Sequence, residues 1–175
     1  MKNKWCVSVA FLFFLVGICI NACTQECNSS NNDRWSEEKI QKWYDDQDWL
    51  IGCNYIPATA INQIEMWSAD TFNPKQIDKE LSWAHDLGFN TLRVFLSSVV
   101  WKNDAKGMKK RMDEFLNICK KYSIRPMFVF FDDCWNAESA YGKQPELKPG
   151  VHNSGWVQDP SCSLRKDTLT LYPFL

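Results

Sequence analysis

Polar and aromatic side chains lie close together at four places in this chain. Asn54 and Tyr55 close one apolar run, Arg93 lies within a second, and the segments 132–136 and 150–158 follow a third. Aromatic rings offer flat apolar surfaces to the C–H faces of a sugar, while amides, carboxylates and guanidinium groups can hydrogen-bond its hydroxyls. This combination is typical of a carbohydrate-binding cleft.

Two acidic residues follow the third apolar run, and only one of them is expected to face a cleft. Asp132 and Asp133 are adjacent, and neighbouring side chains at the end of a strand point to opposite sides. We expect Asp133 to bind a sugar hydroxyl, with the capping of a loop as the alternative. Arg93 stands between Leu92 and Val94, where a guanidinium group is costly unless it is paired. A carboxylate partner is therefore expected for it.

The remaining candidates for sugar binding are tryptophans and polar loop residues. Each tryptophan can serve as a platform for a sugar ring or can simply pack within a loop. Each polar residue can line the site or belong to an ordinary strand end or turn. These candidates are Trp101, Trp135, Trp156, His152, Asn153 and Asn54.

Cofactor and metal chemistry have no motif in this sequence. No G-x-G-x-x-G word follows the first apolar run, and no G-x-x-x-x-G-K-S/T word occurs. The spacings of Cys27, Cys53, Cys119, Cys134 and Cys162 match no paired C-x₂-C zinc pattern. We therefore expect no metal and no cofactor, and we expect Cys119, on the apolar face of a helix, to be a buried thiol.

The elements that must position these residues alternate between strand and helix. Short apolar runs predict strands over 49–55, 91–96 and 125–131, the last of them apolar on both faces. Asn73, Pro74 and Gly88 delimit a helix with an apolar stripe at 77, 81, 84 and 87, and a second helix is predicted over 107–122. A long loop spans 132–163, and a third helix is expected from 164 to 175. The fold class is therefore α/β, with about three βα units.

The N-terminal residues are those of an export signal. Lys2 and Lys4 precede an apolar run over 7–20, which is followed by Ile20-Asn21-Ala22-Cys23. This four-residue segment resembles a bacterial lipobox, which predicts a signal peptide over 1–22, lipidation of Cys23 and a flexible tether over 23–34. The domain proper would then span 35–175. An ordinary secretory signal with a chance cysteine is the alternative.

Composition limits the partners that the chain can have. It has 175 residues, a formal net charge of −1 and nine tryptophans. This composition is that of a globular domain. A net charge close to zero indicates no basic surface that would bind nucleic acid. The expected partners are a polysaccharide or oligosaccharide and, through the lipid on Cys23, a membrane.

Three segments of the sequence resemble those of retaining glycoside hydrolases with a (β/α)₈ barrel, of the cellulase and mannanase type. They also resemble, more narrowly, cellulase-like or xylanase-like lipoproteins of bacteria. These segments are 87–96 (LGFNTLRVFL), 125–135 (RPMFVFFDDCW) and 151–156 (VHNSGW), and the resemblance covers about 49–175. It implies a partial TIM barrel and a double displacement by two carboxylic acids. It also implies that Arg93 orients the nucleophile, with a structural salt bridge as the alternative.

The resemblance also implies which residues this chain lacks. In that superfamily the acid/base glutamate follows an asparagine at the end of the fourth strand, and the nucleophile ends the seventh. No Asn-Glu pair occurs in the sequence, and only three strands are predicted. We therefore expect an N-terminal fragment that ends before strand 4, contains no catalytic residue and has no hydrolase activity alone. The alternatives are a non-catalytic, glycan-binding surface lipoprotein and a degenerate gene product.

Overall fold

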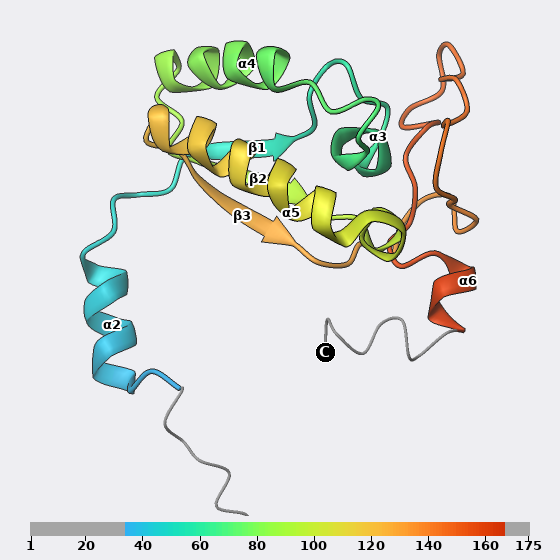
Figure 1. The fold of residues 1–175 in the computed structure, drawn as a ribbon. Coiled ribbons are helices and arrows are strands. Elements are labelled where there is room, and N and C mark those ends of the chain that lie inside the picture. Colours follow the sequence, from blue (N-terminus) through green and yellow to red (C-terminus); the bar gives the residue numbers. More distant parts are fainter. Residues whose placement is uncertain (1–33, 167–175) are drawn as a thin grey trace, which may run out of the picture. The chain divides into compact units, whose positions relative to one another are not determined.

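The computed structural model of the chain describes residues 34–166 (Figure 1), and the chain divides into two units, Met1–Gln47 and Asp48–Leu175. The predicted signal peptide, Cys23 and all of the tether except its last residue lie outside the described residues. Within the described part of the chain, no helix is both long enough and apolar enough to cross a membrane.

The described part of the first unit contains one short helix, α2 (Glu37–Asp45). The hydroxyl of Ser36 accepts a hydrogen bond from the backbone N–H of Lys39, and Glu37 and Glu38 occupy the first turn. Both features stabilise the positive end of a helix. No residue of α2 is buried, so its stability depends on these local interactions.

The second unit is built on a parallel sheet of three strands in the order β1 (Gly52–Tyr55), β2 (Thr91–Phe95) and β3 (Arg125–Val129). The predicted α/β class and the three parallel strands are confirmed. β3 is shorter than predicted and lies at an edge of this sheet, where the side chain of Met127 is 52% exposed. Its apolar composition therefore does not mark a strand buried on both faces.

The two faces of the sheet differ in chemistry. Tyr55, Val94 and Phe128 are aligned in the register. The rings of Tyr55 and Phe128 pack on Phe115, which belongs to a helix that covers this side of the sheet. The neighbouring row, Asn54, Arg93 and Met127, points the other way and is exposed. We call this second side the open face.

The helix α4 (Pro74–Asp86) has the limits that the sequence predicts. The side chain of Asn73 accepts a hydrogen bond from the backbone N–H of Gln76 at 3.0 Å, and Gly88 follows the helix with a φ of 84°. Ile77 and Leu81 are fully buried, as the stripe predicts. Leu87, at the end of the stripe, is instead 73% exposed.

The helix α5 (Ser98–Lys121) begins earlier than the prediction of 107–122. It consists of two helical segments, which meet at a kink where Asp104 has non-helical angles. The Asp104 carboxylate caps the second segment by accepting from the N–H of Gly107 at 2.9 Å. Met108, Phe115 and Cys119 are buried as expected, and burial raises the pKa of the Cys119 thiol to about 12. The last described helix, α6 (Cys162–Arg165), begins earlier than the predicted third helix and ends with Lys166 as its C-cap. Residues 167–175 of that prediction lie outside the described residues.

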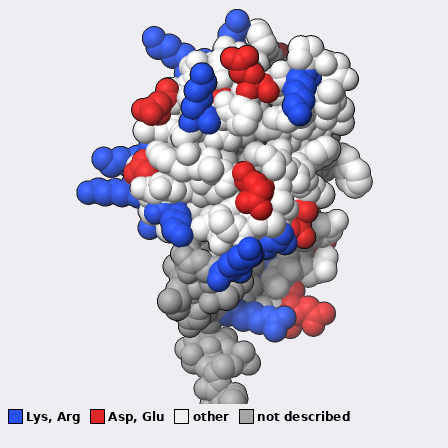
Figure 2. Space-filling view, turned by 90° about the vertical axis from the view of Figure 1, so that its right-hand side faces the viewer, with Lys and Arg blue, Asp and Glu red and all other residues white. Residues whose placement is uncertain are grey.

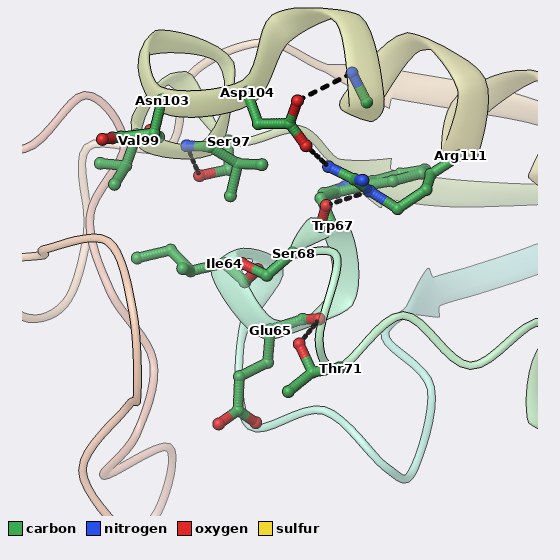
Figure 3. A network of polar contacts seen from close by, with 12 residues as sticks. Ile64, Glu65, Trp67, Ser68, Thr71, Ser97, Val99, Asn103, Asp104 and Arg111 are labelled. Atoms are coloured by element: carbon green, nitrogen blue, oxygen red, sulfur yellow. Dashed lines mark hydrogen bonds and ion pairs between the residues drawn. The ribbon is translucent and has the colours of Figure 1, made fainter.

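The core of the second unit is centred on Trp67, the last residue of α3 (Gln63–Trp67). Its side chain is fully buried and packs on Phe72, Phe115 and Phe128. The indole N–H donates to the carbonyl of Phe95, at the end of β2, at 2.7 Å. The carbonyl of Trp67 accepts from the Arg111 Nε at 2.6 Å, and Figure 3 shows Arg111 reaching both this carbonyl and Asp104. Trp67 thus connects α3 to the sheet and to α5.

We predict that Trp67→Phe lowers the free energy of unfolding by about 1–3 kcal/mol, because it leaves the buried carbonyl of Phe95 without this donor. Denaturation by urea, followed by circular dichroism, measures the loss. Trp83→Phe is the matched control, since Trp83 is 52% exposed on α4, and it should change the free energy by less than about 0.5 kcal/mol. Equal effects of the two substitutions would contradict this account of the core.

Candidate functional site

The long loop after β3 stands beyond the carboxyl ends of the strands, where Figure 1 draws it in orange and red. Its base is closed by two backbone hydrogen bonds between Asp132 and Asp159, at 2.7 and 2.8 Å. Further in, the N–H of Gln158 donates to the carbonyl of Asn136 at 2.9 Å. We call residues 132–159 the closed loop. Loops at this end of parallel strands are where α/β proteins hold their ligands.

The closed loop brings three of the predicted residues into one aromatic cluster: Trp135, His152 and Trp156. The rings of Trp135 and Trp156 meet edge to face, with centroids 5.4 Å apart. The ring of His152 meets Trp135 in the same manner at 6.2 Å. Trp135 is 46% exposed, and its φ of 75° is uncommon for a residue with a side chain. Sugar binding by the aromatic cluster stays a prediction.

Asn153 contributes to the closed loop through its backbone. Its φ is 51°, and its carbonyl accepts a hydrogen bond from the N–H of Trp156 at 3.0 Å. Asparagine tolerates this left-handed conformation better than most residues. The observed role of Asn153 is therefore that of a turn residue that leads into Trp156.

Asp133 holds the closed loop to α6. Its Oδ1 accepts hydrogen bonds from the Gln158 amide at 2.8 Å and from the Arg165 guanidinium at 2.9 Å. Asp133 thus has structural contacts of the kind that its alternative role, the capping of a loop, requires. The Asp133 side chain is nevertheless 75% exposed, so it retains capacity to accept from a sugar hydroxyl, and this second role stays a prediction.

Arg93 and Asn54 lie side by side on the open face. The Arg93 Nη1 donates to the Asn54 Oδ1 at 3.3 Å, and the Arg93 guanidinium also lies 4.6 Å from the centre of the Phe95 ring. Among residues 34–166, no carboxylate forms an ion pair with Arg93. A buried guanidinium group would need a carboxylate partner, whereas the Arg93 guanidinium is exposed to solvent.

The open face is slightly hollowed around these two side chains. The hollow has a volume of about 310 Å³ and is lined by Leu50, Gly52, Cys53, Asn54, Thr91, Arg93 and Met127. β1 and β2 approach so closely here that a Cβ on Gly52 would collide with the carbonyl of Thr91. The small residue in β1 is therefore explained by contact with the neighbouring strand.

Trp101 does not lie in the loop cluster but in the first segment of α5. It is half-buried, packs against the hydrophobic core and has the Lys109 ammonium 5.0 Å from its ring centre. These contacts favour the packing interpretation over a sugar platform. Tyr55 is also directed away from the open face, and its hydroxyl donates to the Glu80 carboxylate at 2.8 Å.

Two residues of this site were not identified from the sequence. The side chains of Asn62 and Gln63, which begin α3, donate to carbonyls of the closed loop, Gly155 and Val157 respectively, both at 2.9 Å. An asparagine followed by the apolar residues of a short helix is a cap signal, so the start of α3 could have been found. The contacts across more than 90 residues of chain have no local signal.

Asp159 is the most buried acidic group of the site. It is 2% exposed, and its Oδ1 accepts from the N–H and the hydroxyl of Ser98 at 2.9 and 2.8 Å. Its Oδ2 is buried without a hydrogen-bond partner among the described residues. Burial raises the pKa of Asp159 to about 6, the bonds from Ser98 and Val99 oppose this rise, and the charge of Asp132 adds to it.

We predict that Asp159→Asn changes how stability depends on pH. The pKa of Asp159 is about 6 in the folded chain, against an ordinary value of 3.8, so the folded state binds more protons between about pH 4 and 6. The free energy of unfolding of the native chain should therefore fall, relative to the variant, by up to about 3 kcal/mol as the pH rises through this window. Asparagine keeps an oxygen for Ser98 and does not titrate.

Urea denaturation of both proteins at several pH values between 4 and 7 measures this difference. Other groups that titrate, such as Asp104, whose pKa Arg111 holds below its ordinary value, cancel in the comparison. Stability curves that run parallel for the two proteins would contradict the assignment to Asp159.

Comparison of the chain with protein-family models and with curated protein sequences found no match. Among solved structures, the chain is similar to "Exo-beta-1,4-mannosidase Op5Man5 from Opitutaceae bacterium strain TAV5", with 23% sequence identity and a TM-score of 0.43. The similarity covers 71% of this chain and 22% of that chain. This chain thus spans about a fifth of the length of that protein. A similarity at this level assigns no activity to the chain.

Proposed function

We propose that the chain binds an uncharged β-linked glycan at the closed loop, as the N-terminal part of a retaining glycoside hydrolase with a (β/α)₈ barrel. The observation that supports this most is the aromatic cluster of Trp135, His152 and Trp156, which stands beyond the carboxyl ends of the strands. Enzymes with this architecture bind their substrates at that end of the sheet.

The aromatic cluster has the properties of a sugar platform. Edge-to-face contacts with Trp156 and His152 hold the Trp135 ring and still leave part of it exposed. A ring that is 46% exposed and fixed by its neighbours loses little conformational entropy when it binds a ligand. Exposed polar groups of His152 and Asp133 are close in sequence to the rings and can hydrogen-bond hydroxyls.

The charge of this side of the molecule supports an uncharged ligand. Figure 2 looks onto it and shows many uncharged residues, with Lys, Arg, Asp and Glu side chains of both signs interspersed. Asp133 and Arg165 neutralise one another in an ion pair at 2.9 Å. A polyanionic ligand would require a surface on which one sign of charge is concentrated.

The chemistry of the open face supports a barrel. Helices on one side of three parallel strands also occur in half of a doubly wound sheet, but the second face of such a sheet is covered by helices and is apolar. Here the central strand β2 presents Arg93 on that face, beside Asn54 of β1. In the proposed barrel, Arg93 would orient a nucleophilic carboxylate supplied by another strand, and two carboxylates would carry out the double displacement.

We predict that Trp135→Ala weakens binding of a β-linked oligosaccharide at least about tenfold, because it removes the exposed platform. Titration calorimetry of the chain with cello-, xylo- and manno-oligosaccharides measures the affinity. Trp83→Ala is the matched control, since Trp83 is similarly exposed but lies on α4, and it should bind as the native chain does.

Binding that is unaffected by Trp135→Ala, or the absence of binding to all three glycans, would overturn the proposed site. Hydrolysis assays on the same glycans test whether the chain has activity alone. We expect no turnover, because the described strands supply no pair of carboxylates at the aromatic cluster. Turnover by the chain alone would contradict the prediction that it contains no catalytic residue.

We also propose that the chain is exported and anchored by a lipid on Cys23. The support is the word over 20–23 after the apolar run. Cys23→Ala should release the protein from the membrane fraction of a bacterial host, as immunoblotting of the fractions would show. Cys27→Ala, four residues away, is the control and should remain in the membrane fraction. Equal distributions of the two variants would contradict lipidation at Cys23.

A further inference from the structure

Asn62 is buried between α3 and the closed loop, and its amide is fully hydrogen-bonded. Its Oδ1 accepts from the backbone N–H groups of Ile64 and Glu65 at 3.0 and 3.2 Å, which caps α3. Its Nδ2 donates to the Gln144 Oε1 at 3.0 Å and to the Gly155 carbonyl at 2.9 Å. A side-chain amide can donate two hydrogen bonds and accept two, so the oxygen serves the helix and the nitrogen serves the loop.

The next residue holds the loop on the other side of Trp156. The Gln63 Nε2 donates to the carbonyl of Val157 at 2.9 Å. The peptide carbonyls of Gly155 and Val157, which flank Trp156, are therefore bound by consecutive side chains. The backbone of Gly155 also lies very close to the side chain of Ile61, with which a Cβ on Gly155 would collide.

The helix that provides these two side chains is itself firmly held. Trp67, at the other end of α3, donates to the Phe95 carbonyl and accepts from Arg111. Figure 3 shows the contact with Arg111 together with the Thr71 hydroxyl, which donates to the carbonyl of Glu65 at 2.6 Å. Since α3 is tied to the sheet and to α5, it is a rigid base from which the loop can be positioned.

We propose that Asn62 and Gln63 are positioning residues that set the place of Trp156 and, through its edge-to-face contact, the ring of Trp135. The inference rests on the proposed function of the aromatic cluster, and it assigns the geometry of that cluster to α3. A residue that only capped its own helix would need the Asn62 oxygen and not the two donors that Asn62 directs at residues 82 and 93 positions later in the chain.

Asn62→Asp separates the two roles of this residue. Aspartate caps a helix as well as asparagine does, so α3 keeps its cap. The nitrogen is replaced by an oxygen that faces the oxygens of Gly155 and Gln144, so the loop loses two hydrogen bonds and is repelled. Asn73→Asp is the matched control, because Asn73 caps α4 through Gln76 and is not a partner of the closed loop.

The first readout needs no ligand. Two indoles 5.4 Å apart couple their electronic transitions and give a paired band of opposite signs in the far-ultraviolet circular dichroism. Trp35 and Trp43 form a second close pair, 6.4 Å apart, so the band is measured as the difference from Trp156→Phe, which lacks only the pair of the aromatic cluster. We expect this difference band in the native chain and in Asn73→Asp, and we expect Asn62→Asp to reduce it. The second readout is glycan affinity, which Asn62→Asp should weaken about tenfold and Asn73→Asp should leave unchanged.

Gln63→Leu is a second variant for the case that Asn62→Asp does not fold, since it removes only the donor to Val157 and keeps a side chain of similar size. The positioning role is overturned if the native chain lacks the paired band, or if the variants that fold keep both the native band and the native affinity. A reduced band in a chain that binds no glycan supports the positioning role and overturns the proposed function, so the two can fail separately.

Discussion

The hydrogen bond from the Trp67 indole to the carbonyl of Phe95 is the interaction on which the rest of the second unit depends. The carbonyl lies where β2 ends and the chain turns into α5, and a buried carbonyl at such a point needs a donor. The indole supplies it from a fully buried ring that also fills the space between α3, α5 and β3. One side chain thereby satisfies a polar group and forms the centre of the apolar core, so α3 cannot move independently of the sheet.

A line of contacts leads from this core to the aromatic cluster. Trp67 and Arg111 hold α3 in place. The N-cap and the first residue of α3 hold the closed loop, and Asp159 joins the base of that loop to the start of α5. Most of these contacts are hydrogen bonds between buried groups, which are costly to leave unmade. The loop therefore has a defined conformation although it contains little regular secondary structure, and a defined conformation is what an aromatic platform requires.

The sequence predicts the parts of this fold whose signals are local. Asn73, Pro74 and Gly88 delimit α4 because capping and left-handed geometry depend on neighbouring residues. The first segment of α5 was missed because Asn103 and Asp104 interrupt the helical pattern, and the kink is stabilised by Arg111 seven positions later. The sequence indicates Trp135, His152 and Trp156 only by their residue types and by their place in the loop after the third strand. Their assembly into one cluster, and its dependence on Asn62, arises from contacts between distant parts of the chain, which periodicity cannot reveal.

The pairing of Asp132 with Asp159 has a consequence for the evolution of this protein. Because this pairing closes the loop beside the sheet, the parts of the loop that lie between its contacts with Asn62, Gln63 and Arg165 can change in length and sequence without altering the strands. The stretch over 146–151 is exposed and forms none of these contacts. Small insertions and substitutions can therefore accumulate there in evolution while the scaffold is inherited unchanged.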